Sequence, residues 1–516
     1  MNEVAKTQSK ATIAELETRN ATLTLEVNEL TRQLDWFKRQ LFGRKSEKRL
    51  EIDPAVQPLL DGLVDAEQTA TFPAPATESI SYARRKKQRD AGCVTDEGLR
   101  FDDSVPVVTI TLPVPADIGD HEVIGEDVTH RLAQRPGSYV VLKYVRQVVK
   151  RKADAVVSSW PAPPTVWAGS LADVSVIAGI LVDKFCHHLP LYRQHQRMTL
   201  SGVQLSRAIL TQWVHRAATL LAPIHAAQLR HVLLSKTLAM DETPIKAGRD
   251  HDKGRMKTGW YWPLYGEDDE VVFTFAQSRA RKHIDTVLAD FHGTLLSDGA
   301  AAYASFARER PELVHAQCWS HTRRMFVKAE MDAPVSVAEA LALIGRLYVV
   351  EAEIRVQQLD AAATLDRRQR DTLPAVDAFF AWVDAQCHRL DLVPSSRLAK
   401  ALAYVREREG ALRVYLGDPT VAIDTNHLER ALRPIPMGRK AWLFCWTEVG
   451  AEYVGVIQSL MTTCRLHGIN PYTYLVDVLQ RIAIHPDKDI DALTPRHWKM
   501  LFANNPLRSD LYLATQ

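Results

Sequence analysis

The stretch Thr237-Leu238-Ala239-Met240-Asp241 is a short, mostly apolar run that ends in an acid, and Glu242-Thr243-Pro244 follows it directly. A second run, from Gly293 to Ser297, leads in the same way into Asp298 and Gly299. Short apolar runs bounded by turn-forming residues are typical of buried β-strands. The sequence therefore predicts two buried strands, each with an aspartate at its carboxyl end.

The segments around these runs predict a mixed α/β domain over residues 236–448. In chain order, its further elements are strands at Gly259 to Tyr265 and Val271 to Phe275, a helix at Lys282 to Phe291, a strand at Leu313 to Cys318, long helices over about 335–416, and a helix that begins near Asn426. With the two aspartate-bearing strands and a helix after the second, the order is β-β-β-α-β-α-β-α. This is the ribonuclease H-like order, with a helical insertion at about 335–416 before the last helix.

Three acids lie on these elements: Asp241, Asp298 and Glu429. Taken singly, each has a structural explanation, since Asp298-Gly299 is a common turn pair, Asp241 could close a strand, and Glu429 could form a capping box with Asn426. Taken together, they fall where a ribonuclease H-like core gathers carboxylates around two metal ions about 3.5–4 Å apart. Carboxylate oxygens suit Mg²⁺. We therefore predict that the three acids are catalytic and bind two Mg²⁺ ions, for which Mn²⁺ could substitute.

The first fifty residues carry a heptad pattern. Its a and d positions include Leu16, Asn20, Leu23, Val27, Leu30 and Leu34. Such a pattern predicts a coiled coil over residues 1–50, and a single Asn at an a position favours a parallel dimer because it pairs with its own copy. The alternative is a helix that packs on its own globular body.

The remaining segments predict four further parts. Residues 51–98 form a basic, Pro-containing linker, residues 99–165 a small β module with turns at Gly125 and Pro136-Gly137, residues 166–235 a helical region, and residues 449–516 a C-terminal helical domain. In the helical region, the turn at Ser201-Gly202 lies between two predicted helices, the second of which Ser206 would cap. This arrangement suits a helix-turn-helix unit, although ordinary helical hairpins are more common.

The chain resembles transposases of the bacterial insertion sequence sixty-six family, a class of DDE transposase, over nearly its full length. The resemblance rests on motifs in one order: Leu41 to Lys48, Lys184, His188 to Gln194, Asp241 to Pro244, Asp298-Gly299 with Tyr303, Cys318 to His321 with Arg323-Arg324, Asn426, Glu429-Arg430, Arg433-Pro434, Gly438 to Lys440, and Trp442 to Phe444. It implies cleavage and joining of transposon ends, with Asp241, Asp298 and Glu429 as the metal-binding triad. DNA, a second copy of the chain and accessory proteins of the same element are the expected partners.

Local basic clusters are the expected DNA contacts. They are Arg84, Arg85, Lys86 and Lys87 in the linker, Lys143, Lys150, Arg151 and Lys152 in the β module, Arg207 and Arg216 on the second helix, and His321, Arg323, Arg324, Arg430, Arg433, Arg439 and Lys440 around the acids. Cations near a carboxylate triad would hold phosphates of the DNA. The alternatives are a solvated tether for the linker run and i,i+4 pairing of Glu429 with Arg433.

The chain departs from the family pattern in the β module. The family usually carries two cysteine pairs there, whereas the stretches near Ala116 to Asp120 and Arg146 to Ala155 contain no cysteine. We therefore expect no zinc. Cys318 and His321, with His315 nearby, could be half a zinc site, but a supporting role behind the carboxylates, or phosphate contact by His321, is the preferred interpretation. The family also favours Asn where this chain has Thr425 and Ala441.

Composition narrows the class of protein. The chain has 516 residues, a net charge of +2 and six cysteines, none of them spaced as Cys-x-x-Cys. A disulfide framework is therefore not expected, and a protein that is basic throughout is excluded. No apolar run is long enough to cross a membrane, and the first thirty residues lack the apolar core of a secretion signal. We expect a cytoplasmic protein, associated with the nucleoid when bound to DNA. An inactive DNA-binding derivative and a hydrolytic nuclease of the same fold are the alternatives.

Overall fold

The computed structural model describes residues 99–101, 105–112, 121–135, 137–152, 157–159, 161–250, 254–442 and 445–513. Three predictions fall outside these residues: the coiled coil of residues 1–50 with its heptad positions, the linker of residues 51–98, and the basic run Arg84 to Lys87. The prediction of a mixed α/β fold is confirmed, because the described chain contains many helices together with two larger sheets, each with parallel and antiparallel strand pairs.

The larger sheet has the strand order β10-β9-β7-β11-β12, and β8 pairs with β9. The strands are β7 (Thr237–Met240), β8 (Thr243–Asp250), β9 (Arg255–Tyr265), β10 (Val271–Ala276), β11 (Thr294–Ser297) and β12 (Val314–Gln317). Strands β7, β11 and β12 are parallel, and β9 is antiparallel to β7. The carboxyl ends of β7 and β11 therefore lie side by side at one edge of the sheet.

The two short strands that carry the aspartates are buried along their whole length. Because both faces are buried, the sequences of β7 and β11 are mostly continuous apolar runs and do not alternate apolar with polar residues. Helices α5 (Lys282–Val287) and α6 (Ala301–Arg308) help to bury them, with Ile284 and Phe306 in the same hydrophobic cluster as Leu238 and Leu295. Strand β8 was not predicted, and the helix predicted to reach Phe291 ends at Val287.

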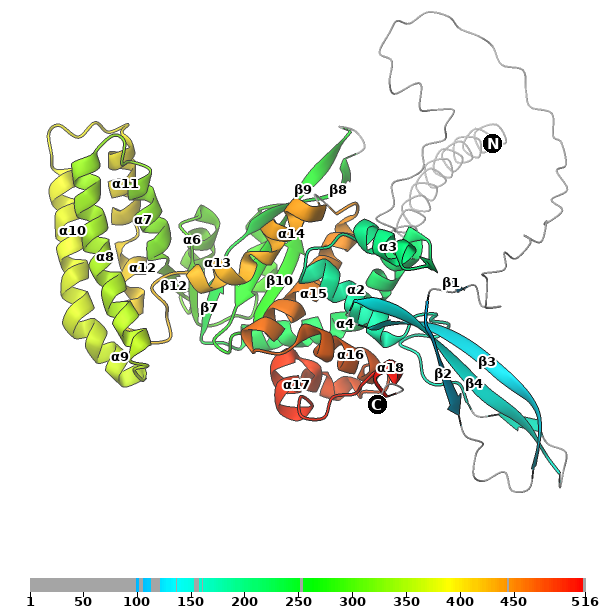
Figure 1. The fold of residues 1–516 in the computed structure, drawn as a ribbon. Coiled ribbons are helices and arrows are strands. Elements are labelled where there is room, and N and C mark those ends of the chain that lie inside the picture. Colours follow the sequence, from blue (N-terminus) through cyan, green and yellow to red (C-terminus); the bar gives the residue numbers. More distant parts are fainter. Residues whose placement is uncertain are drawn as a thin grey trace, which may run out of the picture. The chain divides into compact units, whose positions relative to one another are not determined.

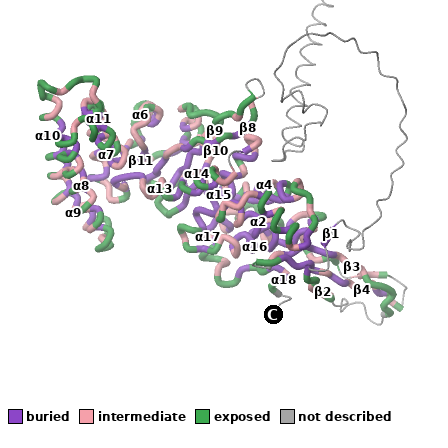
Figure 2. The backbone as a smooth tube through the Cα atoms, turned by 45° about the horizontal axis from the view of Figure 1, so that its top comes forward, coloured by how far each residue is buried: buried purple, intermediate pink, exposed green. Residues whose placement is uncertain are grey.

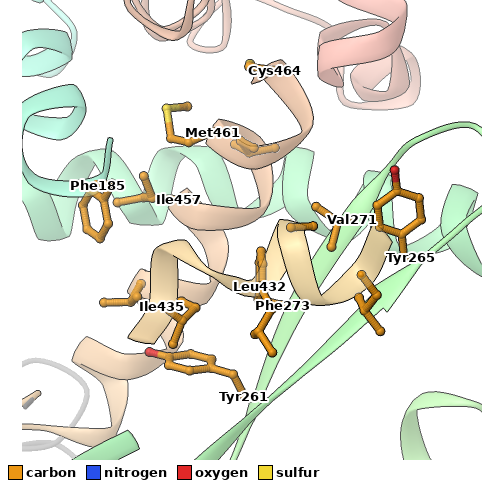
Figure 3. Packing of buried hydrophobic residues seen from close by; sticks show 14 of the residues in the cluster. Phe185, Tyr261, Tyr265, Val271, Phe273, Leu432, Ile435, Ile457, Met461 and Cys464 are labelled. Atoms are coloured by element: carbon orange, nitrogen blue, oxygen red, sulfur yellow. The ribbon is translucent and has the colours of Figure 1, made fainter. Parts of the chain in front are cut away.

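Helix α15 (Glu448–Leu466) covers the outer edge of β10. Figure 3 shows Ile457 and Met461 of this helix in one packed cluster with Val271 and Phe273 of β10. Ser459 Oγ accepts a hydrogen bond from Phe273 N (2.8 Å), and Thr463 Oγ1 accepts one from Val271 N (3.1 Å). The helix thus bonds the backbone groups that an edge strand would otherwise leave unpaired.

In chain order, a helical bundle follows β12, and Figure 1 shows it to one side of the large sheet. Its helices are α7 (Trp319–Val327), α8 (Pro334–Val356), α9 (Ala361–Arg367), α10 (Leu373–Cys387), α11 (Arg397–Arg406) and α12 (Glu409–Arg413), with a π-helical turn at Arg368–Thr372. Phe379 contacts Trp319, Phe326 and Trp382, and Trp319 Nε1 donates to Leu412 O (2.9 Å). The chain then returns through α13 (Asn426–Leu432) and α14 (Pro434–Trp442).

The β module is a second sheet, with β3 (His121–Arg135) and β4 (Ser138–Arg151) as a long hairpin. Strands β2 (Val107–Leu112) and β5 (Val157–Ser159) flank β4, and a separate pair joins β1 (Arg100–Phe101) to β6 (Val203–Gln204). Residues 122–126, in the part of the hairpin away from its turn, are all exposed (Figure 2).

The predicted pair of helices is present, with one correction. Helix α2 (Val174–Phe185) precedes α3 (Leu191–Leu200) and α4 (Arg207–Leu233). Ser206 is the N-cap residue of α4, but its side chain makes no capping hydrogen bond, so the predicted cap is wrong in that respect. Helix α4 has 27 residues and runs through Pro223, and Gln228 Nε2 donates to Val271 O of the large sheet (2.9 Å).

The C-terminal segment is helical, with α16 (Pro471–Arg481), a 3₁₀ segment (Asp487–Leu493), α17 (Pro495–Leu501) and α18 (Asp510–Leu513). It returns to the β module, where Tyr144 OH donates to Asp510 Oδ2 (2.7 Å). Within the described part of the chain, no helix is long and apolar enough to cross a membrane.

Candidate metal centre

Asp241 and Asp298 follow the adjacent parallel strands β7 and β11. Asp241 Oδ1 accepts a hydrogen bond from Glu242 N (2.7 Å), and Asp298 Oδ1 accepts one from Ala300 N (2.8 Å). One carboxylate oxygen from each of Asp241, Glu242 and Asp298 lies within 4.8 Å of the other two. The structure therefore brings the two predicted aspartates together and adds Glu242 to them.

Glu242 is a site residue that sequence reasoning did not select. Its side chain is only 3% exposed, and both carboxylate oxygens have donors. Tyr303 OH donates to Oε2 (2.7 Å), and Arg279 Nε donates to Oε1 (2.6 Å). The signals available in the sequence were its position beside Asp241 and the presence of Tyr303 in the motif after Asp298.

Glu429 lies beside this group rather than within it. Its Oε1 is 3.6 Å from Arg324 Nη2 and 3.8 Å from His321 Nε2, and this oxygen is buried without a hydrogen-bond partner. The capping-box explanation for Glu429 is wrong, because Asn426 is the first residue of α13 and its side chain donates to Asp424 Oδ2 (2.6 Å). The side chain of Glu429 is thus not used to begin the helix.

Mutual repulsion and burial act on the carboxyl of Asp241. Burial raises the pKa of Asp241 to about 7, and the charges of Glu242, Asp298 and Glu429 act in the same direction. Burial also lowers the pKa of His321, and Arg324 lowers it further. His321 is therefore mainly neutral near pH 7, where it can serve as a hydrogen-bonding group but not as a cation.

The donor set suits a hard divalent cation. Three carboxylates converge from two strand ends, and a fourth, Glu429, presents a buried oxygen that has no hydrogen bond. Buried polar atoms are normally bonded, so an unbonded carboxylate oxygen next to other carboxylates indicates a place for a metal ligand. Asp241, Asp298 and Glu429, with Glu242 behind Asp241, are the residues that would hold Mg²⁺.

The side chains considered as half a zinc site have different partners. Cys318 is 1% exposed, and its Sγ accepts hydrogen bonds from Thr425 N and Thr425 Oγ1, each at 3.3 Å. His315 Nε2 bonds with Ser297 Oγ (2.9 Å). Thr425 is the N-cap residue of α13, so Cys318 supports the helix that carries Glu429. This is the supporting role that the sequence favoured.

The described basic residues lie in four places: on α4, on β4, on α7, and on α13 with α14. Arg207 and Arg216 are exposed on α4, and Lys143, Lys150 and Arg151 lie on β4 with Lys152 after it. His321, Arg323 and Arg324 lie on α7, next to the acids. Arg430, Arg433 and Lys440 are exposed on and after α13, and Arg439 Nη1 donates to Pro244 O. Glu429 forms an ion pair with Arg324 and lies 3.8 Å from the ring nitrogen of His321, and the alternative pairing with Arg433 is not found among the described residues.

Comparison with known proteins gives three family matches. A model described as the Transposase IS66 family matches residues 169–453, one described as the IS66 C-terminal element matches residues 459–496, and one described as the Transposase C of IS166 homeodomain matches residues 29–110. The first of these matches spans more than half of the chain and includes every described acid of the candidate metal centre.

Three relatives from Sinorhizobium fredii (strain NBRC 101917 / NGR234) are similar over most of the chain. Uncharacterized protein y4jD is 28% identical, covering 92% of this chain and 96% of that protein. Uncharacterized protein y4hP is 29% identical, covering 90% and 88%, and Uncharacterized protein y4qI is 30% identical, covering 75% and 74%.

Proposed function

This chain belongs to the IS66 family of transposases, and from this premise we propose that it binds the ends of its insertion sequence and catalyses Mg²⁺-dependent cleavage and strand transfer into target DNA. The observation that carries the proposal is the convergence of Asp241, Glu242 and Asp298 at the carboxyl ends of two parallel strands. DNA phosphodiester chemistry of this kind needs divalent cations held by carboxylates.

The strand order supports a ribonuclease H-like core. In the order β10-β9-β7-β11-β12, strands β7, β11 and β12 are parallel neighbours and β9 runs antiparallel to both β7 and β10. Helices α8 to α12 interrupt the chain before α13. We assign residues 236–448 to this core, with the insertion at about 335–416. The assignments of residues 99–165, 166–235 and 449–516 as further domains belong to the same proposal.

Each acid has a role in this reaction. Asp241 and Asp298, with Glu429, would hold two Mg²⁺ ions, which when bound activate the attacking oxygen and stabilise the leaving one. Glu242, fixed by Tyr303 and Arg279, holds the backbone turn after β7 in place. His321 and Arg324 lie next to Glu429 and are suited to contact a phosphate of the bound strand.

DNA binding away from the acids would use the basic residues named above, including Arg84 to Lys87, Lys143 to Lys152, Arg207 and Arg216. The match of residues 29–110 to a homeodomain description supports DNA contact by the N-terminal part. A coiled coil over residues 1–50 would make the chain a dimer, and the cytoplasm, on the nucleoid, is where such a protein would act.

A strand-transfer assay tests this function directly. Labelled transposon ends, a target plasmid and Mg²⁺ should yield joined products with the intact chain, and none after chelation of the metal. Products of cut ends without joining would favour a hydrolytic nuclease. End binding with neither cutting nor joining would favour an inactive DNA-binding derivative.

A further inference from the structure

A pocket of about 480 Å³ opens beside Asp298, and its walls come from four separate elements. The turn after β11 and the start of α6 supply Asp298 to Ala302, α7 supplies Arg324 and Lys328 at its C-terminal end, and the loop after β10 supplies Arg279. Tyr404 of α11 closes one side, so the helical insertion takes part in the pocket. We call this cavity the Asp298 pocket.

The charge of the Asp298 pocket is positive. Arg279, Arg324 and Lys328 line it against the single carboxylate of Asp298, which leaves a formal charge of +2 on its lining side chains. Arg279 is partly balanced by Glu242, yet its side chain remains 52% exposed. Arg324 is partly balanced by Glu429, at 3.6 Å, yet its side chain is 51% exposed. Lys328 is exposed with no ion pair among the described residues. The pocket therefore suits an anion.

The N-terminus of α6 adds to this preference. Ala300 is the N-cap residue and offers no side-chain hydrogen bond, so the first-turn N–H groups of Ala301 and Ala302 have no partner within the helix. Both alanines line the Asp298 pocket, and their small side chains allow a ligand to approach the backbone. The partial positive charge of a helix N-terminus favours phosphate.

The location of the pocket indicates which phosphate it would bind. Asp298 belongs to both the pocket and the candidate metal centre, so an anion bound there lies next to the place where a DNA strand is cut. We infer that the Asp298 pocket holds a backbone phosphate of the DNA strand, one that neighbours the scissile phosphate. This inference rests on the proposed function, and it adds Lys328, Arg279 and the start of α6 to the DNA-binding surface.

The pocket is also kept in shape by the insertion. Arg408 Nη2 donates to Gly299 O (3.2 Å), and its guanidinium lies over the ring of Tyr404 at 4.0 Å from the ring centroid. A side chain at position 299 would collide with Tyr404, since a Cβ there would be 2.0 Å from the Tyr404 hydroxyl oxygen. The turn that carries Asp298 is therefore held by Tyr404 of α11 and by Arg408, which precedes α12, and this keeps the pocket next to the carboxylates.

DNA-binding measurements without metal test the inference. A fluorescent oligonucleotide with a single-stranded end is titrated in chelator with the full-length chain and with a variant carrying Arg324→Ala and Lys328→Ala. We expect this variant to bind about tenfold or more weakly and to lose about 0.7 from the slope of log affinity against log salt, since each phosphate neutralised on a single strand contributes roughly 0.7. The matched control carries Arg346→Ala and Arg355→Ala, which remove two exposed cations of α8 that do not line the pocket. It should change affinity by less than about twofold.

A scan with neutral linkages identifies the phosphate. Oligonucleotides that each carry one methylphosphonate are compared on the wild-type chain and the double variant. One position should weaken binding to the wild type but not to the variant. If no position behaves in this way, or if the variant binds like its control, the pocket does not hold a DNA phosphate.

Two further outcomes are distinct. Inorganic phosphate that displaces the oligonucleotide at micromolar concentration would reassign the pocket to a free anion. A wild-type chain that neither binds nor joins DNA would defeat the proposed function itself, whereas a chain that joins DNA normally with both pocket cations removed would defeat only this inference.

Discussion

Buried polar groups occur at two places on the large sheet. At one place they have hydrogen-bond partners, and at the other a carboxylate oxygen has none. At the outer edge of β10, Ser459 and Thr463 of α15 bond the backbone N–H groups of Phe273 and Val271. At the carboxyl ends of β7 and β11, three acids gather, and Glu429 Oε1 of α13, beside them, has no hydrogen bond. Bonded buried groups stabilise a fold, whereas unbonded ones cost stability and are kept where chemistry needs them.

The contrast extends to the acids themselves. Asp477 is fully buried, and its carboxylate accepts hydrogen bonds from Trp498 Nε1 (3.0 Å) and Leu507 N (2.6 Å) and pairs with Arg481. Asp241 has one backbone donor and three acidic neighbours. The first carboxylate ties the C-terminal helices together, and the second is available to a cation.

The largest expected difference between the two regions concerns activity. Asp241→Asn, Asp298→Asn and Glu429→Gln should each lower strand cleavage and joining about a thousandfold or more, because losing a metal ligand removes several kcal/mol of transition-state stabilisation. Their end binding should remain within about threefold of wild type, and their melting temperatures should not fall.

The matched acid variant is Asp477→Asn. It should lower the melting temperature, since a hydrogen-bonded buried charge is lost at a cost of about 1.5–3 kcal/mol, and leave the activity of folded molecules unchanged. Near-normal joining by any of the three site variants would remove that residue from the metal centre.

A smaller effect, on stability alone, is expected where α15 meets β10. A Cβ at Gly455 would lie 2.8 Å from Phe273 O, a backbone atom that cannot move aside cheaply. Gly455→Ala should therefore destabilise the chain by about 1–3 kcal/mol through overpacking. Gly345→Ala is the control, because nothing lies within 4 Å of a Cβ there and alanine should stabilise α8 by up to about 1 kcal/mol. Equal denaturation midpoints for the two variants would contradict the close approach of α15.

The sequence predicted the parts of the site that depend on local pattern. The runs before Asp241 and Asp298 are buried strands, as their composition indicated, and Glu429 lies near the start of a helix. It did not predict β8, because pairing of Thr243–Asp250 with β9 depends on distant residues and Pro244 suggested a strand end. It also missed the burial of Glu242, which depends on Tyr303 and Arg279, more than thirty residues away in the sequence.

The length of helix α4 also depends on contacts with residues that are distant in the sequence. The sequence predicted where the second helix begins but not where it ends, and α4 continues through Pro223 to Leu233. Tertiary contacts outweigh local preference here, since Gln228 bonds both Val271 O and Thr463 Oγ1. A pattern read along one segment cannot reveal a partner that lies in another.

Two tyrosines, one near the acids and one near the edge of β10, allow these two regions to be compared by a single type of substitution. Tyr303 OH donates to Glu242 Oε2 (2.7 Å) near the acids, and Tyr261 OH donates to Ala451 O (2.8 Å) near the edge covered by α15. Replacing either by Phe removes one buried hydrogen bond and should cost about 1–2 kcal/mol of stability.

Only Tyr303→Phe should reduce joining, by about five- to tenfold at saturating DNA, because Glu242 then loses a group that fixes the turn after β7. Thermal melting and single-turnover rates of the two variants decide the matter. Equal rates for both would show that Glu242 does not need its tyrosine partner.

The smallest effect is the pH dependence of stability without metal. Burial raises the pKa of Asp241 to about 7 in the folded chain, above its ordinary value of 3.8, so the folded state binds more protons than the unfolded state between these values. The stabilising contribution of protonated Asp241 is therefore fully present below about pH 4 and is lost as the pH rises through about 7. Because the side chain is partly exposed, solvent screening should limit the total to about 1 kcal/mol.

Buried histidines contribute a pH dependence of stability that is opposite in sign to that of Asp241. The contribution of Asp241 is therefore measured as the difference in stability between wild type and an Asp241 variant. The pKa values of His225, His283 and His315 are lowered to about 4 by burial, and their contribution to stability decreases as the pH falls from about 6.5 to about 4. Asp241→Asn leaves these histidines unchanged and removes only the decline due to Asp241. In chelator, its stability relative to wild type should therefore increase from about pH 4 to about pH 7, and Mg²⁺ at pH 7 should stabilise wild type but not the variant. A difference that stays constant across this range would mean that Asp241 is already ionised, with its carboxylate paired as fully as those that hold the fold together.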